Sequence, residues 1–239
     1  MYNGTTMIEQ LEGSLIVVTI NYRLNVFGFA GSGNLLSPEG STGNWGILDQ
    51  RLAFEWVQNN IQAFNGDPSK VTIFGESPGA GSVSVHMSSP GSWGYFNKAI
   101  GESGSFSQWV AQPMSVTESR YSQLRKIAGC GTSDACLSTI SASFLFSVSA
   151  SLPLVPSIPG RFSCGGSGFG PTVDGIVLPS HPYVLASTGG IADKPFMFGT
   201  NTDEGSSFFL LPHNTSDIAV EAFWKEGAST TWKPLRGFT

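Results

Sequence analysis

The chain has 239 residues, of which only 12% are charged, and its formal net charge at pH 7 is −5. This length suffices for one sizeable α/β domain with a buried core, while the acidic balance argues against a nucleic-acid or anionic-membrane partner. The longest strongly apolar stretch, around Leu15 to Ile20, is far too short for a transmembrane segment. The three histidines are scattered without the spacing of a metal site, so no metal is expected.

Strand and helix patterns alternate along the chain. The continuous apolar, β-branched run Ser14–Ile20 predicts a strand buried on both faces of a parallel sheet. After an irregular, glycine-rich stretch, the helical spacing of apolar residues predicts a helix from about Leu48 to Ile61. The later predicted elements are strands at Val71–Phe74, Ala99–Ile100 and Phe196–Gly199, and helices up to Met87 and from Ser119 to Ala128. This rhythm predicts a mostly parallel central sheet flanked by helices.

The strand predicted at 71–74 runs directly into Gly75-Glu76-Ser77-Pro78-Gly79, a Gly-x-Ser-x-Gly motif. Between a strand and a helix, this motif forms a tight turn in which the serine is strained and its hydroxyl is exposed above the sheet. We expect a Cβ at either glycine to collide with the neighbouring strand or helix. Ser77 is therefore a candidate nucleophile. The alternative is a glycine-rich turn that only packs.

The three cysteines bear on the cellular compartment. Cys130 and Cys136 flank a short polar loop, and their spacing is compatible with a small-loop disulfide, whereas Cys164 has no evident partner. Two glycosylation sequons begin at Asn3 and Asn214. Together with the low charge content, these features favour a secreted, extracellular protein.

Several ordered segments resemble type-B carboxylesterases and the cholinesterase-like lipases of the same family. The matching segments are residues 21–29, 43–50, parts of 53–68, 71–77, 103–105 and 201–205. The matches are dense from Val17 to Trp109 and patchier from there to Leu210. The resemblance implies an α/β-hydrolase fold. It also implies that residues 1–239 form one partial domain of this kind, incomplete at both ends.

The resemblance assigns roles to individual residues. Ser77 takes the position of the nucleophile and Glu204 that of the acid in a Ser–Glu–His triad, which acts through an acyl-enzyme without a cofactor. Glu76 corresponds to a substrate-binding position that adds negative field to the site, although an acid there also suits a helix N-terminus. Arg23 and Asp49 are expected to form a structural ion pair.

Some of the family's machinery is missing from the sequence. The triad histidine should follow Glu204 by a long interval, and we expect none of His86, His181 and His213 to be the base. We expect the glycine-rich turn that supplies oxyanion donors to precede this chain. Gly75, Pro78 and Gly79 form the turn beside the oxyanion, but Pro78 stands where the family normally provides a backbone N–H, which proline lacks.

These observations leave three hypotheses. The first is a serine ester hydrolase acting on a small-molecule or lipid ester, with the isolated chain inactive. The second is a catalytically inactive, cholinesterase-like binding or adhesion domain, which Pro78 favours and the retention of Ser77 and Glu204 opposes. The third is an inert truncated product. In each case we expect unpaired sheet edges and exposed apolar faces.

Overall fold

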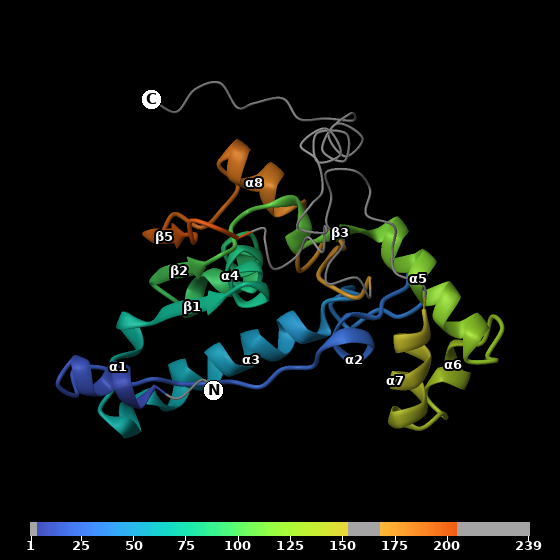
Figure 1. The fold of residues 1–239 in the computed structure, drawn as a ribbon, viewed down its shortest axis with the longest axis horizontal. Helices are drawn as coiled ribbons and strands as arrows, with labels where there is room; N and C mark the ends of the chain where they lie inside the picture. Colours follow the sequence, from blue (N-terminus) through green and yellow to red (C-terminus); the bar gives the residue numbers. More distant parts are fainter. Residues whose placement is uncertain (1–3, 153–167, 205–239) are drawn as a thin grey trace, which may run out of the picture.

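A computed structural model describes residues 4–152 and 168–204 of the chain (Figure 1). The helices are α1 (Thr5–Gln10), α2 (Asn25–Phe29), α3 (Trp45–Asn60), α4 (Pro78–Met87), α5 (Met114–Ile127), α6 (Asp134–Leu137), α7 (Ala142–Ser151) and α8 (Pro182–Thr188). The strands are β1 (Thr72–Glu76), β2 (Lys98–Glu102), β3 (Gln112–Pro113), β4 (Thr172–Val173) and β5 (Phe196–Gly199). Short 3-10 turns follow α3, precede β1 and lie on either side of β2.

The main sheet of the described residues is parallel, with the strand order β1-β2-β5. The register places Glu76 of β1 opposite Glu102 of β2, and Glu102 opposite Gly199 of β5. All three strands therefore end at the same edge. Residues that follow the strands are brought together there, although they lie far apart in the sequence.

Most of the predicted elements are present. The helices expected at 48–61 and 119–128 are α3 and α5, and the strands expected at 71–74, 99–100 and 196–199 are β1, β2 and β5, so these predictions are confirmed. The parallel sheet flanked by helices is confirmed as well (Figure 1).

The strand predicted at Ser14–Ile20 is wrong for this structure. The segment is extended but pairs with no described strand. Its side chains pack elsewhere: Val17 lies against Gly4 at the start of α1, and Ile16 lies against Gly66 beyond the end of α3. A β-strand needs a hydrogen-bonded neighbouring strand, so the β propensity of a segment is not enough to make it a strand.

In the described ranges two hydrophobic clusters form the core, and α4 contributes to both. Val85 packs in the cluster formed with α2, α3, α5, α7 and the segment 169–178, whereas Val83 and Met87 pack against β1 and β2. Nearly every residue of α4 from Ala80 to Met87 is buried. A helix that is buried on nearly all sides in this way is enclosed by its neighbours, and this enclosure positions its N-terminus.

Exposed large apolar side chains occur on many elements of the described residues, and α3 and β1 carry several of them. Leu52, Trp56 and Phe64, on and just after α3, are 65%, 47% and 58% exposed, and Phe74 of β1 is 49% exposed. Within the described residues β1 pairs with β2 alone, so its other edge is open. No described helix combines the length and the hydrophobicity needed to cross a membrane.

The predicted disulfide joins Cys130 to Cys136, with their Cα atoms 5.5 Å apart. It closes the turn between α5 and α6, where the Arg125 guanidinium also pairs with the Asp134 carboxylate at 2.7 Å. Cys164 and the sequons at Asn3 and Asn214 lie outside the described residues.

His86 is a fully satisfied core residue. Its Nε2 and Nδ1 atoms lie 2.8 Å from Gln50 Oε1 and 2.9 Å from Ser92 Oγ, and its ring meets Phe54 edge-on. Burial, assisted by the nearby charge of Arg51, lowers the pKa of His86 to about 3. The imidazole is therefore neutral in the folded protein at ordinary pH.

This lowered pKa predicts a loss of stability in mild acid. Between the unfolded pKa of 6.5 and the folded value of about 3, the unfolded chain binds a proton that the folded chain does not. The free energy of unfolding therefore falls as the pH falls, by about 2 kcal/mol from pH 7 to pH 5 for this group. Urea unfolding at both pH values should show a smaller fall in His86→Gln, and equal falls would contradict the assignment.

Candidate active site

Ser77 lies at the turn between β1 and α4 with φ 53° and ψ −113°. Its N–H donates to the Glu102 carbonyl at 2.8 Å, and its own carbonyl accepts from Gly81 N–H at 3.0 Å. A positive φ costs a non-glycine residue about 1–3 kcal/mol, so the flanking strand and helix must impose it. The strained strand-to-helix turn predicted from the motif is therefore present, with Ser77 only partly buried.

The two motif glycines differ in their roles. A Cβ on Gly75 would lie 2.5 Å from the carbonyl carbon of Gly79, so the expected collision is confirmed there. A Cβ on Gly79 would meet no described atom within 4 Å, and the collision predicted for Gly79 is wrong. Gly79 lies in the first turn of α4, where its backbone is the surface that Gly75 approaches. Pro78 occupies the first position of α4, which its fixed φ suits.

Glu204 lies beyond the carboxyl end of β5 and is held by two donors. Its Oε1 atom accepts from Ser103 Oγ at 2.6 Å and from Asn201 N–H at 2.7 Å. These hydrogen bonds, that from Ser103 first, lower the pKa of Glu204 below its usual value. The carboxylate is therefore ionised and oriented at neutral pH.

Ser103 is a site residue that sequence reasoning missed. It directly follows β2, has φ 53° as Ser77 has, and donates its N–H to the Gly199 carbonyl at 2.8 Å. Because β1 and β2 run in register, Ser77 and Ser103 occupy equivalent positions after neighbouring strands. The match of segment 103–105 to the family was a signal for its importance, but not for its hydrogen bond to Glu204.

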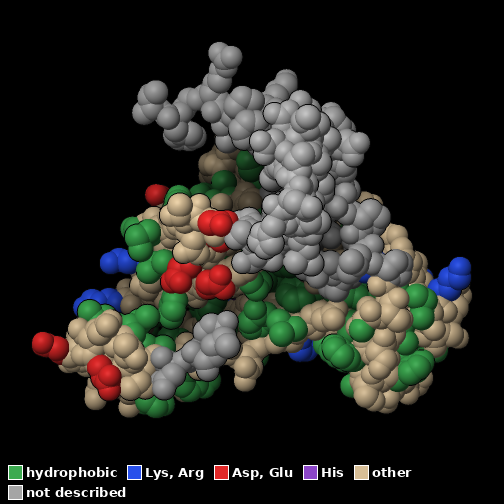
Figure 2. All heavy atoms as spheres, viewed as in Figure 1, with side chains coloured by type: hydrophobic (Ala, Val, Ile, Leu, Met, Phe, Trp, Pro, Cys, Tyr) green, Lys and Arg blue, Asp and Glu red, His purple; other side chains and the backbone are tan. Residues whose placement is uncertain are grey.

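A hollow of about 270 Å³ lies at this edge of the sheet. It is lined by Glu76 and Glu102 together with Ser103 and residues 199–201. Glu76 lines this hollow, while its role in substrate binding stays a prediction, and Glu102 is an additional carboxylate that sequence reasoning missed. Figure 2 shows acidic side chains gathered over this end of the sheet. The lining carries no Lys or Arg, so the hollow favours neutral or cationic groups.

The described histidines take no part in the hollow. His86 is buried in the core, and His181 caps α8 by accepting the Tyr183 N–H, while its Nε2 lies 3.2 Å from the Ala111 carbonyl. His213 lies outside the described residues.

No group of three His, Cys, Asp or Glu side chains within the described ranges could hold a metal ion. Arg23 and Asp49 pair as expected, with an N–O distance of 2.7 Å.

Comparison with known proteins agrees with this geometry. Residues 1–234 match the Carboxylesterase family. The chain is 38% identical to the cholinesterase of Mus musculus over 222 residues, which cover 87% of this chain and 35% of the relative. It is 36% identical to cholinesterase 2 of Branchiostoma lanceolatum over 219 residues, covering 87% of this chain and 62% of the relative.

Solved structures give the same result. The carboxylesterase EST55 of Geobacillus stearothermophilus superposes with a TM-score of 0.73 at 38% identity, covering 87% of this chain and 42% of that one. A PNB esterase superposes with a TM-score of 0.70 at 32% identity, covering 86% and 42%. The chain therefore belongs to the carboxylesterase family and has the α/β-hydrolase fold. It spans between about a third and two thirds of the length of these relatives.

The contact between Ser103 and Glu204 predicts a pKa change that can be measured in the chain itself. Ser103→Ala removes the main donor to the carboxylate, so the pKa of Glu204 should rise toward its ordinary value. Carbon-13 NMR titration of the Glu204 carboxyl measures this directly. Ser105→Ala, in the same segment, is the matched control and should leave the titration unchanged. An unshifted pKa in Ser103→Ala would mean that this hydrogen bond does not hold the acid.

Proposed function

We propose that the chain is the central part of a serine carboxylic-ester hydrolase domain that works through an acyl-enzyme. Ser77 attacks the ester carbonyl, a histidine outside this chain removes its proton, and Glu204 orients that histidine; water then releases the acid. The observation that carries the proposal is the strained turn at Ser77 with an oriented, ionised Glu204 at the same sheet edge. This route needs no metal or organic cofactor.

The acidic hollow supports a neutral or cationic carboxylic ester as the substrate. Glu76 and Glu102 line it, and a carboxylate-lined hollow repels an anionic substrate and attracts a cation. The relatives called cholinesterases and carboxylesterases agree with a small-molecule or lipid ester. The disulfide Cys130–Cys136 supports a secreted protein.

The 239-residue chain alone should turn over little or no ester. The proposed base is not among its residues, and the glycine-rich turn with the remaining oxyanion donors is expected to precede it. Without the imidazole, the Ser77 hydroxyl keeps its proton and is a weak nucleophile.

A second candidate function is a binding or adhesion domain without catalysis, and the observation that favours it is Pro78. Proline at the first position of α4 removes the N–H next to the nucleophile. The retained Ser77 geometry and the oriented Glu204 favour the hydrolase instead. An inert truncated product would share the structure of the described residues with either function.

The proposal is tested by completing the domain. We would fuse the chain to the flanking segments of the Geobacillus carboxylesterase and follow the hydrolysis of a p-nitrophenyl ester and the labelling by a fluorophosphonate. Ser77→Ala should abolish labelling and reduce turnover at least about a thousandfold. Ser105→Ala, next to the site but without a proposed role, should change neither. A fusion that folds, shown by its circular dichroism, but neither labels nor hydrolyses the ester would contradict the proposal.

Pro78 provides a further prediction in the same fusion. Pro78→Ala restores a backbone N–H beside the nucleophile, so ester turnover should rise by up to about a hundredfold. The matched control is Pro68→Ala, which also changes a proline at the start of a helical turn but lies away from the site. Unchanged turnover in Pro78→Ala would show that this donor is dispensable.

A further inference from the structure

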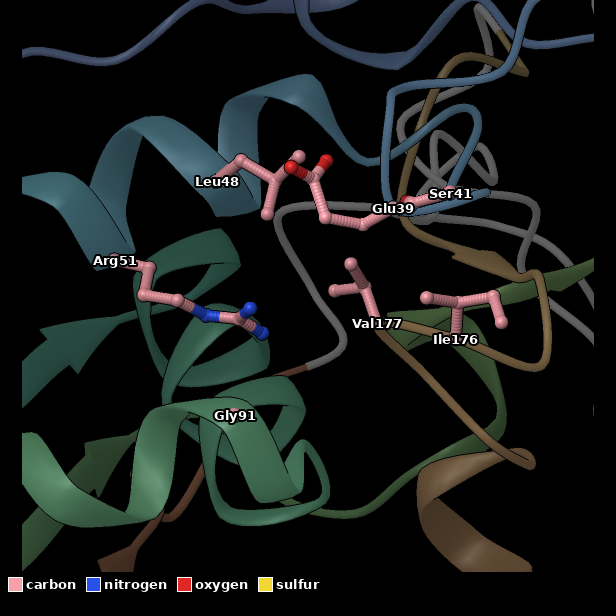
Figure 3. Close-up of a pocket in the computed structure, with 7 residues that line it drawn as sticks. All are labelled: Glu39, Ser41, Leu48, Arg51, Gly91, Ile176 and Val177. Atoms are coloured by element: carbon pink, nitrogen blue, oxygen red, sulfur yellow. The ribbon is translucent and has the colours of Figure 1, made fainter.

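A second hollow, of about 330 Å³, shares no lining residue with the candidate active site. It lies between α3, the loop that contains Glu39 and Ser41, and the turn at Ile176 and Val177 (Figure 3). Its wall combines one cation, Arg51, and one exposed anion, Glu39, with aliphatic side chains between them.

Arg51 is a partly buried cation with neutral partners. Its Nη2 donates to Ser89 Oγ at 2.7 Å and its Nε to Ser92 Oγ at 3.2 Å, which fixes the plane of the guanidinium. The guanidinium rests on Gly91, where a Cβ would lie 2.8 Å from Nη1. No carboxylate of the described residues lies within ion-pair distance of it. Its charge is thus held in place but not neutralised by contact.

Asp174, the nearest acid on the turn, is engaged elsewhere. Its Oδ2 accepts from Ser41 Oγ at 2.5 Å and Thr42 N–H at 3.4 Å, and its Oδ1 accepts from the N–H groups of Ile176 and Leu178 at 3.0 Å. These four donors tie the carboxylate to its own turn and the facing loop. Asp174 therefore shapes the wall and does not occupy the hollow.

Glu39 supplies the exposed anion of the hollow. Its side chain is exposed, and its hydrogen bond with Ser37 lowers the pKa of the carboxyl, which is therefore ionised at neutral pH. Within the part of the chain that the structure describes, no Lys or Arg pairs with it. In Figure 3 its carboxylate and the Arg51 guanidinium lie on different sides of the hollow.

The surface between the two charges is aliphatic. Leu48, Ile176 and Val177 line the hollow, and Ile176 is 51% exposed. Covering such a surface with a hydrocarbon body is favourable at about 25 cal/mol per Å². Two opposite charges at separate sides of an apolar wall match a molecule that carries both charges on one aliphatic frame.

We propose that this hollow binds a small dipolar molecule: its carboxylate pairs with Arg51, its ammonium group with Glu39, and its aliphatic body lies on Leu48 and Ile176. A simple anion would be repelled by Glu39 and a simple cation by Arg51, whereas a zwitterion satisfies both groups. Ser92 and Ser89 take up Nε and one N–H of Nη2, so the planar guanidinium still has Nη1 and the second N–H of Nη2 to donate to a carboxylate from its end.

The probe is the zwitterion 6-aminohexanoate. It is compared with hexanoate and hexylammonium, each of which has a similar aliphatic chain but only one of the two charges. The methyl resonances of Ile176 and Val177 in the chain report occupancy of the hollow by NMR titration. The zwitterion should bind saturably and about fivefold more tightly than either singly charged compound, the gain expected of one additional exposed ion pair. No saturable methyl shift, or equal affinity for all three compounds, would overturn the proposal.

Glu39→Gln separates a dipolar site from a plain anion site. Glu39 is exposed, so its replacement should leave the fold intact, and the zwitterion should then bind no more tightly than hexanoate. Tighter binding of hexanoate than of the zwitterion by the unaltered chain would overturn the proposal in favour of an anion site. Glu55→Gln, which changes an exposed acid of helix α3 outside the hollow, is the matched control and should bind as the unaltered chain does.

Discussion

The structure depends on the close approach of β1 and α4 through the turn at Ser77. Gly75 lies so close to the backbone of Gly79 that no side chain fits between them, and the strand must therefore reverse into the helix at once. Because α4 is buried on nearly all sides and belongs to both hydrophobic clusters, its axis cannot move without disturbing both. This packing stabilises the positive φ of Ser77, which an isolated turn would not retain.

The parallel register creates the charge distribution of the site. Since β1, β2 and β5 end together, Glu76 and Glu102 face the same hollow, and Glu204 lies just beyond it. Carboxylates so arranged repel one another, which is tolerable only while water reaches them. Glu204 differs from the other two because the donors Ser103 and Asn201 favour its charged form. Its carboxylate is consequently held ionised and oriented, which is the state that its proposed role beside a histidine requires.

The sequence predicts the local parts of this arrangement well and the distant ones poorly. The β-branched run before Gly75 and the motif after it predict β1, the turn and α4, because strand preference, glycine and proline act over a few residues. The run at 14–20 has the same strand preference but no paired neighbour, so local pattern gives the wrong answer there. The contact from Ser103 to Glu204 spans 101 positions and follows only from the register of the sheet.

Pro78 shows how one residue can serve the fold and oppose the chemistry. Pro78 occupies the first position of α4, where a backbone N–H would have no helical carbonyl to bind. The missing N–H and the fixed φ of proline therefore do not destabilise the start of the helix. An oxyanion beside Ser77, in contrast, would need the backbone N–H of residue 78 as a donor. The helix cannot offer another N–H at this place without moving Ser77 itself. The same tight turn that exposes Ser77, the proposed nucleophile, would therefore leave the charge that develops on a substrate short of one partner. Stabilisation of that charge falls to groups outside the turn, and the strength of those groups determines whether this site hydrolyses esters quickly, slowly or only binds them.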